Sequence, residues 1–161
     1  MSISYKKSIE FKLLKKSFDR VNVDCKYDKD EYSLYTLGCN TDGSFVINKT
    51  YLSLDFNIDS KEVLGISGFI GDLYDLPSID INGFTVKADA ILIFDADEAF
   101  KPGIGYNFNY DGKVLYDAEK KCLCVLPIDK KTMPDEFYRI SKNIFVALNN
   151  SMIECIIIRL E

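Results

Sequence analysis

The chain has 161 residues, of which 47% are hydrophobic and 28% charged, and its formal net charge is −5. This length predicts a single domain over residues 1–161 with a self-sufficient core, and the composition excludes disordered and fibrous proteins. The charge argues against nucleic acid as the main partner, because phosphate binding needs clustered cations.

The first half of the chain predicts short strands separated by polar turns. Residues 8–20 fit a strand or a helix, since Ile9, Phe11 and Leu13 alternate while the wider apolar spacing is also helical. Residues 52–58 alternate between apolar and polar side chains, which is typical of a strand with one buried face. Further strands are expected at residues 32–37, 45–47 and 63–69. Gly65 and Gly68 interrupt the last of these, which indicates a bulge or a close backbone approach.

The second half carries two pairs of residues that are typical of hairpin turns. Asn82-Gly83 stands between two short alternating runs and predicts a hairpin, because both residues tolerate positive φ. Asp111-Gly112 predicts a second turn. Residues 137–148 fit either a helix or two short strands. Further strands are expected at residues 88–94, 106–110, 114–116, 123–126 and 152–160.

These elements predict a fold that is mainly β to α+β, with at most two helices. The abundance of Phe and Tyr, at 11 and 10 residues, favours sheet because aromatic side chains fit pleated surfaces. The strand spacing indicates an antiparallel sandwich or a strongly curved sheet. Strands do not alternate with long helices, which argues against a doubly wound parallel fold.

The sequence predicts a soluble, cytoplasmic protein without a bound metal or cofactor. No apolar run follows the N-terminal lysines as in an export signal, and the run at residues 90–94 is far shorter than a membrane helix. The five cysteines are expected to be reduced and mostly packed as small apolar side chains. The chain has no His, and Cys122 and Cys124 lack the spacing of zinc ribbons.

One short motif carries a catalytic alternative. Residues 91–97, Ile-Leu-Ile-Phe-Asp-Ala-Asp, resemble the nucleophile motif of haloacid dehalogenase-type phosphatases. The resemblance implies that Asp95 would attack phosphorus and that Asp97 would act as acid–base beside Mg²⁺. It covers seven residues, Glu98 departs from the usual pattern, and the strand–helix repeats of that fold are not predicted here. We therefore expect no enzyme, with a small hydrolase near Asp95 and Asp97 as an alternative.

A longer stretch, over residues 30–160, contains a second set of characteristic segments, at residues 51–55, 57–59, 63–69, 116–117 and 122–125 and in the Ile-rich end of the chain. With these segments the stretch resembles the small immunity proteins of contact-dependent growth inhibition and polymorphic toxin systems. The resemblance implies a cytoplasmic, non-catalytic protein that binds and neutralises a toxin domain, often a basic nuclease. No signature motif accompanies it, so no functional residues carry over. A structural or self-assembling subunit, including a homo-oligomer, is another alternative.

Acidic residues indicate where such a partner would bind. Residues 1–20 carry a net charge of +4, so the remaining residues carry −9, and carboxylates are densest from residue 72 to 98. We expect the loops at residues 72–77 and 95–102 to form the contact face, with Tyr74 and Phe100 as apolar anchors. Their carboxylates would speed association with a basic partner. These carboxylates belong to Asp72, Asp75, Asp95, Asp97 and Glu98.

Overall fold

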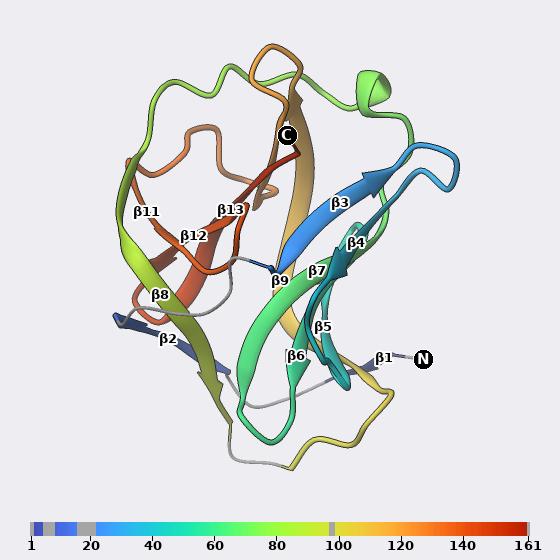
Figure 1. Ribbon diagram of the computed structural model, residues 1–161, viewed down its shortest axis with the longest axis vertical. Helices are drawn as coiled ribbons and strands as arrows, with labels where there is room; N and C mark the ends of the chain where they lie inside the picture. Colours follow the sequence, from blue (N-terminus) through green and yellow to red (C-terminus); the bar gives the residue numbers. More distant parts are fainter. Residues whose placement is uncertain (1, 5–8, 16–21, 97–98, 161) are drawn as a thin grey trace.

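The computed structural model describes residues 2–4, 9–15, 22–96 and 99–160, and its strands belong to one sheet (Figure 1). The strands are β1 (Ser2–Ser4), β2 (Glu10–Lys15), β3 (Asp24–Asp28), β4 (Ser33–Leu37), β5 (Gly43–Asn48), β6 (Tyr51–Asn57), β7 (Glu62–Phe69), β8 (Thr85–Asp95), β9 (Gly105–Asp117), β10 (Cys122–Pro127), β11 (Glu136–Arg139), β12 (Ile144–Asn149) and β13 (Met152–Arg159). A 3-10 turn, η1 (Leu73–Asp75), is the one helical element in these ranges. The mainly β prediction is confirmed, and no helix of the described residues is long and apolar enough to cross a membrane.

Nine of the strands close into a barrel, in the order β7-β8-β11-β12-β13-β10-β9-β5-β6 and back to β7. The closing contact is short: Glu62 pairs with Ile93, and Val63 pairs with Leu92. Outside the ring, β2 pairs with β8, and the β3–β4 hairpin joins the end of β7. The expected sandwich or strongly curved sheet is therefore corrected to a closed barrel, in which closure removes the edges of these nine strands.

The sheet is mixed, which corrects the expectation of purely antiparallel pairing. Strands that follow one another in the chain pair antiparallel, as in β5–β6–β7 and β12–β13. The parallel pairs are β5 with β9, β8 with β11, and β1 with β9. Each parallel pair joins strands that are distant in the sequence, and strand spacing carries no information about such pairing.

Aromatic rings fill the interior of the barrel. Phe45 in β5 is wholly buried, and five other Phe rings surround it at centroid distances between 4.4 and 5.8 Å. These rings are Phe11, Phe56, Phe94, Phe100 and Phe108. Most of the contacts are edge-to-face, the arrangement that the ring quadrupole favours. The interior is thus a packed core, and the side chains open to a partner lie on the outer surface.

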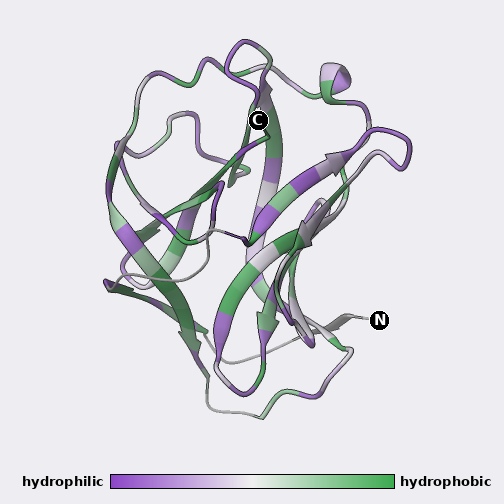
Figure 2. Cartoon of the chain, viewed as in Figure 1, coloured by the Kyte–Doolittle hydropathy of each residue, from purple (hydrophilic) through white to green (hydrophobic). Residues whose placement is uncertain are grey.

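A second apolar core lies on the outer face of β10, β11, β12 and β13. Its buried members are Ile81, Cys122, Cys124, Leu126, Phe137, Phe145, Ala147, Cys155 and Ile157. These strands carry apolar residues on both faces, which explains their continuous hydrophobic runs. The C-terminal half of β8 is a similar run in Figure 2. Four of the five cysteines are buried, as the sequence predicted.

Two of the turn predictions are wrong, and the packing decides between the two alternatives at residues 137–148. Residues 76–84 form no hairpin around Asn82-Gly83, because they cover the second core and bury Ile81. Strand β9 continues through Gly112, whose added Cβ would lie 2.7 Å from Ile47 Cγ2. Residues 137–148 are strands β11 and β12 rather than a helix. Residues 10–15 are strand β2, and residues 16–21 of the ambiguous N-terminal segment lie outside the described residues.

Candidate functional site

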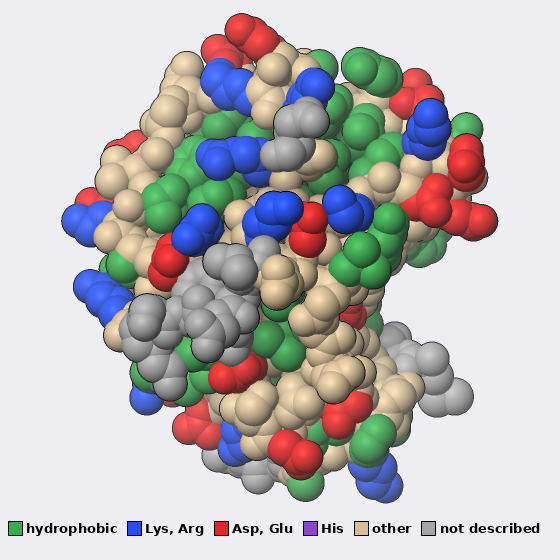
Figure 3. All heavy atoms as spheres, viewed as in Figure 1, with side chains coloured by type: hydrophobic (Ala, Val, Ile, Leu, Met, Phe, Trp, Pro, Cys, Tyr) green, Lys and Arg blue, Asp and Glu red, His purple; other side chains and the backbone are tan. Residues whose placement is uncertain are grey.

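Acidic side chains and tyrosines gather on one lobe of the surface. In Figure 3 the red atoms of Asp and Glu crowd the upper right, where Figure 1 places η1 and the turn between β3 and β4. We call this surface the acidic lobe. It consists of Asp28, Asp30, Glu31 and Tyr32 from the turn, with the exposed Lys29 among them, and of Asp72, Tyr74 and Asp75 from the η1 segment.

Hydrogen bonds fix the β3–β4 turn of the acidic lobe and join it to the η1 segment. The Asp28 carboxylate accepts from the backbone N–H groups of Asp30 and Glu31, at 2.9 and 3.2 Å, which closes the turn. The Tyr32 carbonyl accepts from Ile70 and Gly71, at 2.9 and 3.1 Å. Two segments that are 40 residues apart in the sequence therefore form one rigid surface.

Carboxylates from both segments act on the hydroxyl of one tyrosine, Tyr27. Burial raises the pKa of Tyr27 above its ordinary value of 10.0, and the carboxylates of Asp72 and Asp28 raise it further. The Tyr27 hydroxyl donates to the Gly71 carbonyl at 2.8 Å, between the two groups of acids. Tyr74 is 80% exposed, and its ring makes an edge-to-face contact with Tyr116 at a centroid distance of 6.1 Å. An exposed aromatic among carboxylates is a typical anchor for a protein partner.

An open apolar groove of about 350 Å³ is reached from the acidic lobe through Ile70 and Leu76. We call it the Tyr51 groove. Tyr51 and Phe69 face each other across β6 and β7, with ring centroids 6.0 Å apart. They are 80% and 49% exposed, and Ile128 beside them is 51% exposed. The full lining is Lys49, Thr50, Tyr51, Phe69, Ile70, Leu76, Gly112, Lys113, Val114 and Ile128.

Local backbone structure explains why these large side chains point outward. Side chains of β6 alternate between the two faces of the sheet. Leu52, Leu54 and Phe56 are buried, so Tyr51 faces solvent. Gly68 has a φ of +132°, and a Cβ there would overlap the Tyr51 carbonyl oxygen. The Thr50 hydroxyl donates to the Ile47 carbonyl at 2.7 Å and accepts from the Leu52 N–H at 3.0 Å. The groove is thus held by a tight turn on one side and a close strand contact on the other.

The structure places the residues expected at the contact face in two separate regions. Asp72, Tyr74 and Asp75 belong to the acidic lobe. Asp95 is exposed at the C-terminal end of β8, at the opposite end of the molecule in Figure 1. Asp97 and Glu98 lie outside the described residues. The two loops therefore do not form one face.

Phe100 also differs from its expected role as an exposed anchor. Its ring is half-buried and packs against Phe45, Phe56, Phe94 and Tyr106, at centroid distances between 4.6 and 5.7 Å. Phe100 thus closes one end of the barrel core. Sequence reasoning missed Asp28, Asp30, Glu31 and Tyr32, although three carboxylates within four residues, interrupted by Lys29 and followed by Tyr32, are a readable signal.

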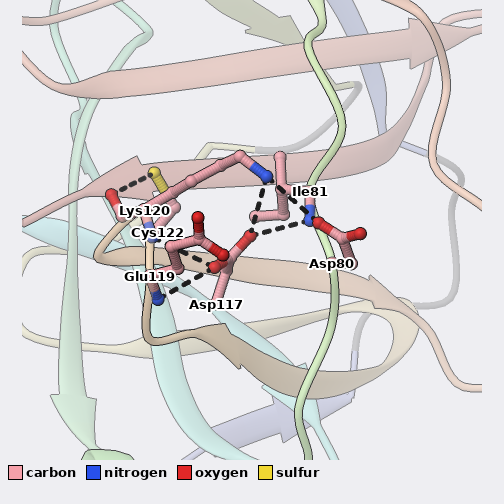
Figure 4. Close-up of polar contacts among 6 residues, drawn as sticks. All are labelled: Asp80, Ile81, Asp117, Glu119, Lys120 and Cys122. Atoms are coloured by element: carbon pink, nitrogen blue, oxygen red, sulfur yellow. Dashed lines mark hydrogen bonds and ion pairs between the residues drawn. The ribbon is translucent and has the colours of Figure 1, made fainter.

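A separate buried carboxylate, Asp117, is the strongest other candidate for chemistry (Figure 4). It is 4% exposed, and its oxygens accept backbone N–H groups of Ile81, Glu119 and Lys120 at 2.8 to 3.1 Å. The Lys120 ammonium lies 3.5 Å from it and 3.0 Å from Asp80. Each contact fastens the 76–84 segment or the β9–β10 turn, so the group is structural.

The pKa of Asp117 makes these structural contacts sensitive to acid. Burial raises it, but the hydrogen bonds from Ile81 and Lys120 and the Lys120 charge outweigh burial, so the pKa lies below its ordinary value of 3.8. A carboxylate with a lowered folded pKa stabilises the protein above 3.8, and this contribution is lost as pH falls through the folded value. Burial raises the pKa of Asp55, so the ionisation of Asp55 as pH rises lowers the stability of the fold.

We expect Asp117→Asn to lower the free energy of unfolding by about 1–3 kcal/mol at pH 7, because an amide nitrogen replaces one acceptor. Below pH 3.8 the difference from the parent protein should shrink as the native carboxylate protonates. Urea unfolding between pH 7 and pH 2 measures both effects. Asp80→Asn, which changes the exposed partner of the same lysine, serves as the control and should stay within about 0.5 kcal/mol. A constant difference at every pH would contradict the role given to the Asp117 charge.

Comparisons of the chain with protein family models, curated proteins and solved structures return no match. Within residues 2–4, 9–15, 22–96 and 99–160, no three His, Cys, Asp or Glu side chains are grouped so that they could hold a metal ion.

Proposed function

We propose that this chain is a non-catalytic domain that binds a basic protein partner through the acidic lobe. Its narrower role would be that of an immunity protein that neutralises a toxin domain. The observation that carries the proposal is the gathering of exposed tyrosines among five carboxylates on one rigid surface, drawn from two distant segments.

The composition of the lobe suits this role on physical grounds. Tyrosine buries a large area on binding, loses little side-chain entropy and keeps a hydrogen-bonding hydroxyl. Tyr32 and Tyr74 supply two such anchors. Carboxylates around the anchors attract a basic partner over several ångströms and raise the association rate, an effect that salt weakens.

The test uses the protein encoded by the neighbouring gene as partner and measures binding kinetics at low and high salt. We expect Asp30→Lys with Glu31→Lys to weaken binding about tenfold at low salt, mainly by slowing association. Tyr74→Ala should weaken binding at least as much, mainly by speeding dissociation. Asp28 and Asp72 are left unchanged because they accept backbone hydrogen bonds.

Asp95→Lys is the control for a single charge reversal, since it reverses an exposed charge at the other end of the molecule. It should bind like the parent protein. If Asp95→Lys weakens binding while the lobe variants do not, the contact face lies at the β8 end. If no partner binds, and size-exclusion chromatography shows an assembly of the chain with itself, the subunit alternative replaces the proposal.

A further inference from the structure

We infer that the Tyr51 groove takes a second element of the same partner, an extended segment with an apolar side chain flanked by carboxylates. This deepens the proposed function and rests on it for the claim that the occupant is a protein. The partner would then present a basic surface to the acidic lobe and a short acidic, apolar segment to the groove.

The first step concerns the shape of the groove. Its volume of about 350 Å³ is at the low end of the roughly 300–1,000 Å³ typical of ligand sites. Small-molecule sites enclose most of their ligand, whereas this groove is open and two of its walls, Tyr51 and Ile128, project from the surface. An open apolar channel between projecting side chains suits an extended segment whose backbone stays at the surface.

The second step concerns the charges at the rim. Lys49 and Lys113 line the groove, and neither forms an ion pair with any of the described residues. Lys130, by contrast, does form an ion pair, because its ammonium lies 3.1 Å from the Glu154 carboxylate. The groove lining contains no acidic side chain. Two lysines without carboxylate partners beside an apolar surface are complementary to a segment that supplies the carboxylates.

The third step concerns preorganisation. Lys49 has a φ of +69° in the β5–β6 turn, and the Thr50 hydrogen bonds hold that turn. Lys113 lies within β9 and pairs with Leu126 of β10. The backbones of both lysines are therefore fixed before binding, so on this protein's side the ordering costs are confined to the side chains.

The experiment uses two capped peptides as probes, each with one Phe: one flanked by Glu residues and one by Lys residues. Methyl NMR spectra of the full chain report on Ile70, Val114 and Ile128, which line the groove. We expect the Glu peptide to shift these methyl signals and the Lys peptide to shift them much less. Lys49→Glu with Lys113→Glu should weaken binding of the Glu peptide about tenfold and favour the Lys peptide. Ile128→Asp should abolish both responses.

Lys87→Glu with Lys101→Glu is the matched control, because it changes the net charge equally at exposed sites outside the groove lining. It should leave peptide binding unchanged. Laurate, added in a separate titration, tests whether the groove takes a lipid chain instead of a peptide. Three results would overturn the inference. They are an equal response to both peptides, binding of laurate but of neither peptide, and self-association of the chain that Ile128→Asp abolishes. If the peptides fail while the lobe variants still weaken partner binding, only the groove inference fails. If the peptides bind the groove and no partner depends on the lobe, the proposed function fails instead.

Discussion

Replacing Asn143 by Ala is expected to lower the free energy of unfolding by about 3–5 kcal/mol, since it leaves several buried polar groups unpaired. Asn143 is 7% exposed and lies between β11 and β12. Its Oδ1 accepts from the Cys25 N–H at 2.9 Å, and its Nδ2 donates to the carbonyls of Cys25 and Arg159 at 2.6 and 2.7 Å. One side chain thus joins the edge of β3 to the end of β13.

Equilibrium unfolding in urea measures the effect of Asn143→Ala. Asn143→Asp keeps an acceptor for Cys25 but removes both donors, so it separates the two kinds of bond and should also be strongly destabilising. Asn82→Ala alters an exposed amide and serves as the control, within about 0.5 kcal/mol of the parent protein. A loss below about 1 kcal/mol for Asn143→Ala would mean that water or a backbone shift replaces its hydrogen bonds.

Gly68→Ala is expected to destabilise the protein by about 3–5 kcal/mol, because backbone strain and a steric overlap act together. The φ of Gly68 is +132°, a region that side chains rarely adopt. The added methyl group would also meet the carbonyl of Tyr51 and the Cα of Leu52. Strands β6 and β7 would have to separate where they hold the two aromatic walls of the Tyr51 groove.

Gly71→Ala is the control that separates the two causes. Gly71 also has a positive φ, of +81°, but a Cβ there meets nothing within 4 Å. It should therefore show the strain alone, roughly 1 kcal/mol. Thermal unfolding of both variants gives the comparison, and the groove methyl signals show whether Tyr51 and Phe69 have moved. Equal losses at the two positions would leave no role for the overlap with Tyr51.

Local patterns predicted strands well where one face of the strand is buried. The alternation at residues 52–58 corresponds to β6, with Leu52, Leu54 and Phe56 turned inward. The same reasoning does not reveal barrel closure, because closure depends on two residue pairs between β7 and β8. The Asn82-Gly83 prediction was wrong for a related reason. The Ile81 N–H donates to Asp117, 36 residues away, instead of to a hairpin neighbour.

The candidate site shows the same division between local and distant information. The acidic character of residues 72–75 was readable from the sequence, and the structure places these residues on the acidic lobe. Their contact with the β3–β4 turn depends on the Tyr32 carbonyl, which accepts hydrogen bonds from the N–H groups of Ile70 and Gly71. The Tyr51 groove depends on the register that sets Tyr51 opposite Phe69. Neither contact has a local sequence signal.

The acidic side chains and tyrosines of the acidic lobe belong to neither apolar core, although Leu73 of the same 3-10 segment packs against the barrel core. Exposed side chains such as Asp30, Glu31 and Tyr74 can therefore be exchanged at little cost in folding free energy, typically within about 0.5 kcal/mol. The barrel does not depend on the identity of these side chains, so this surface can change while the fold is kept. Descendants of one ancestral chain could thus acquire different partners, one surface substitution at a time, without passing through an unfolded intermediate.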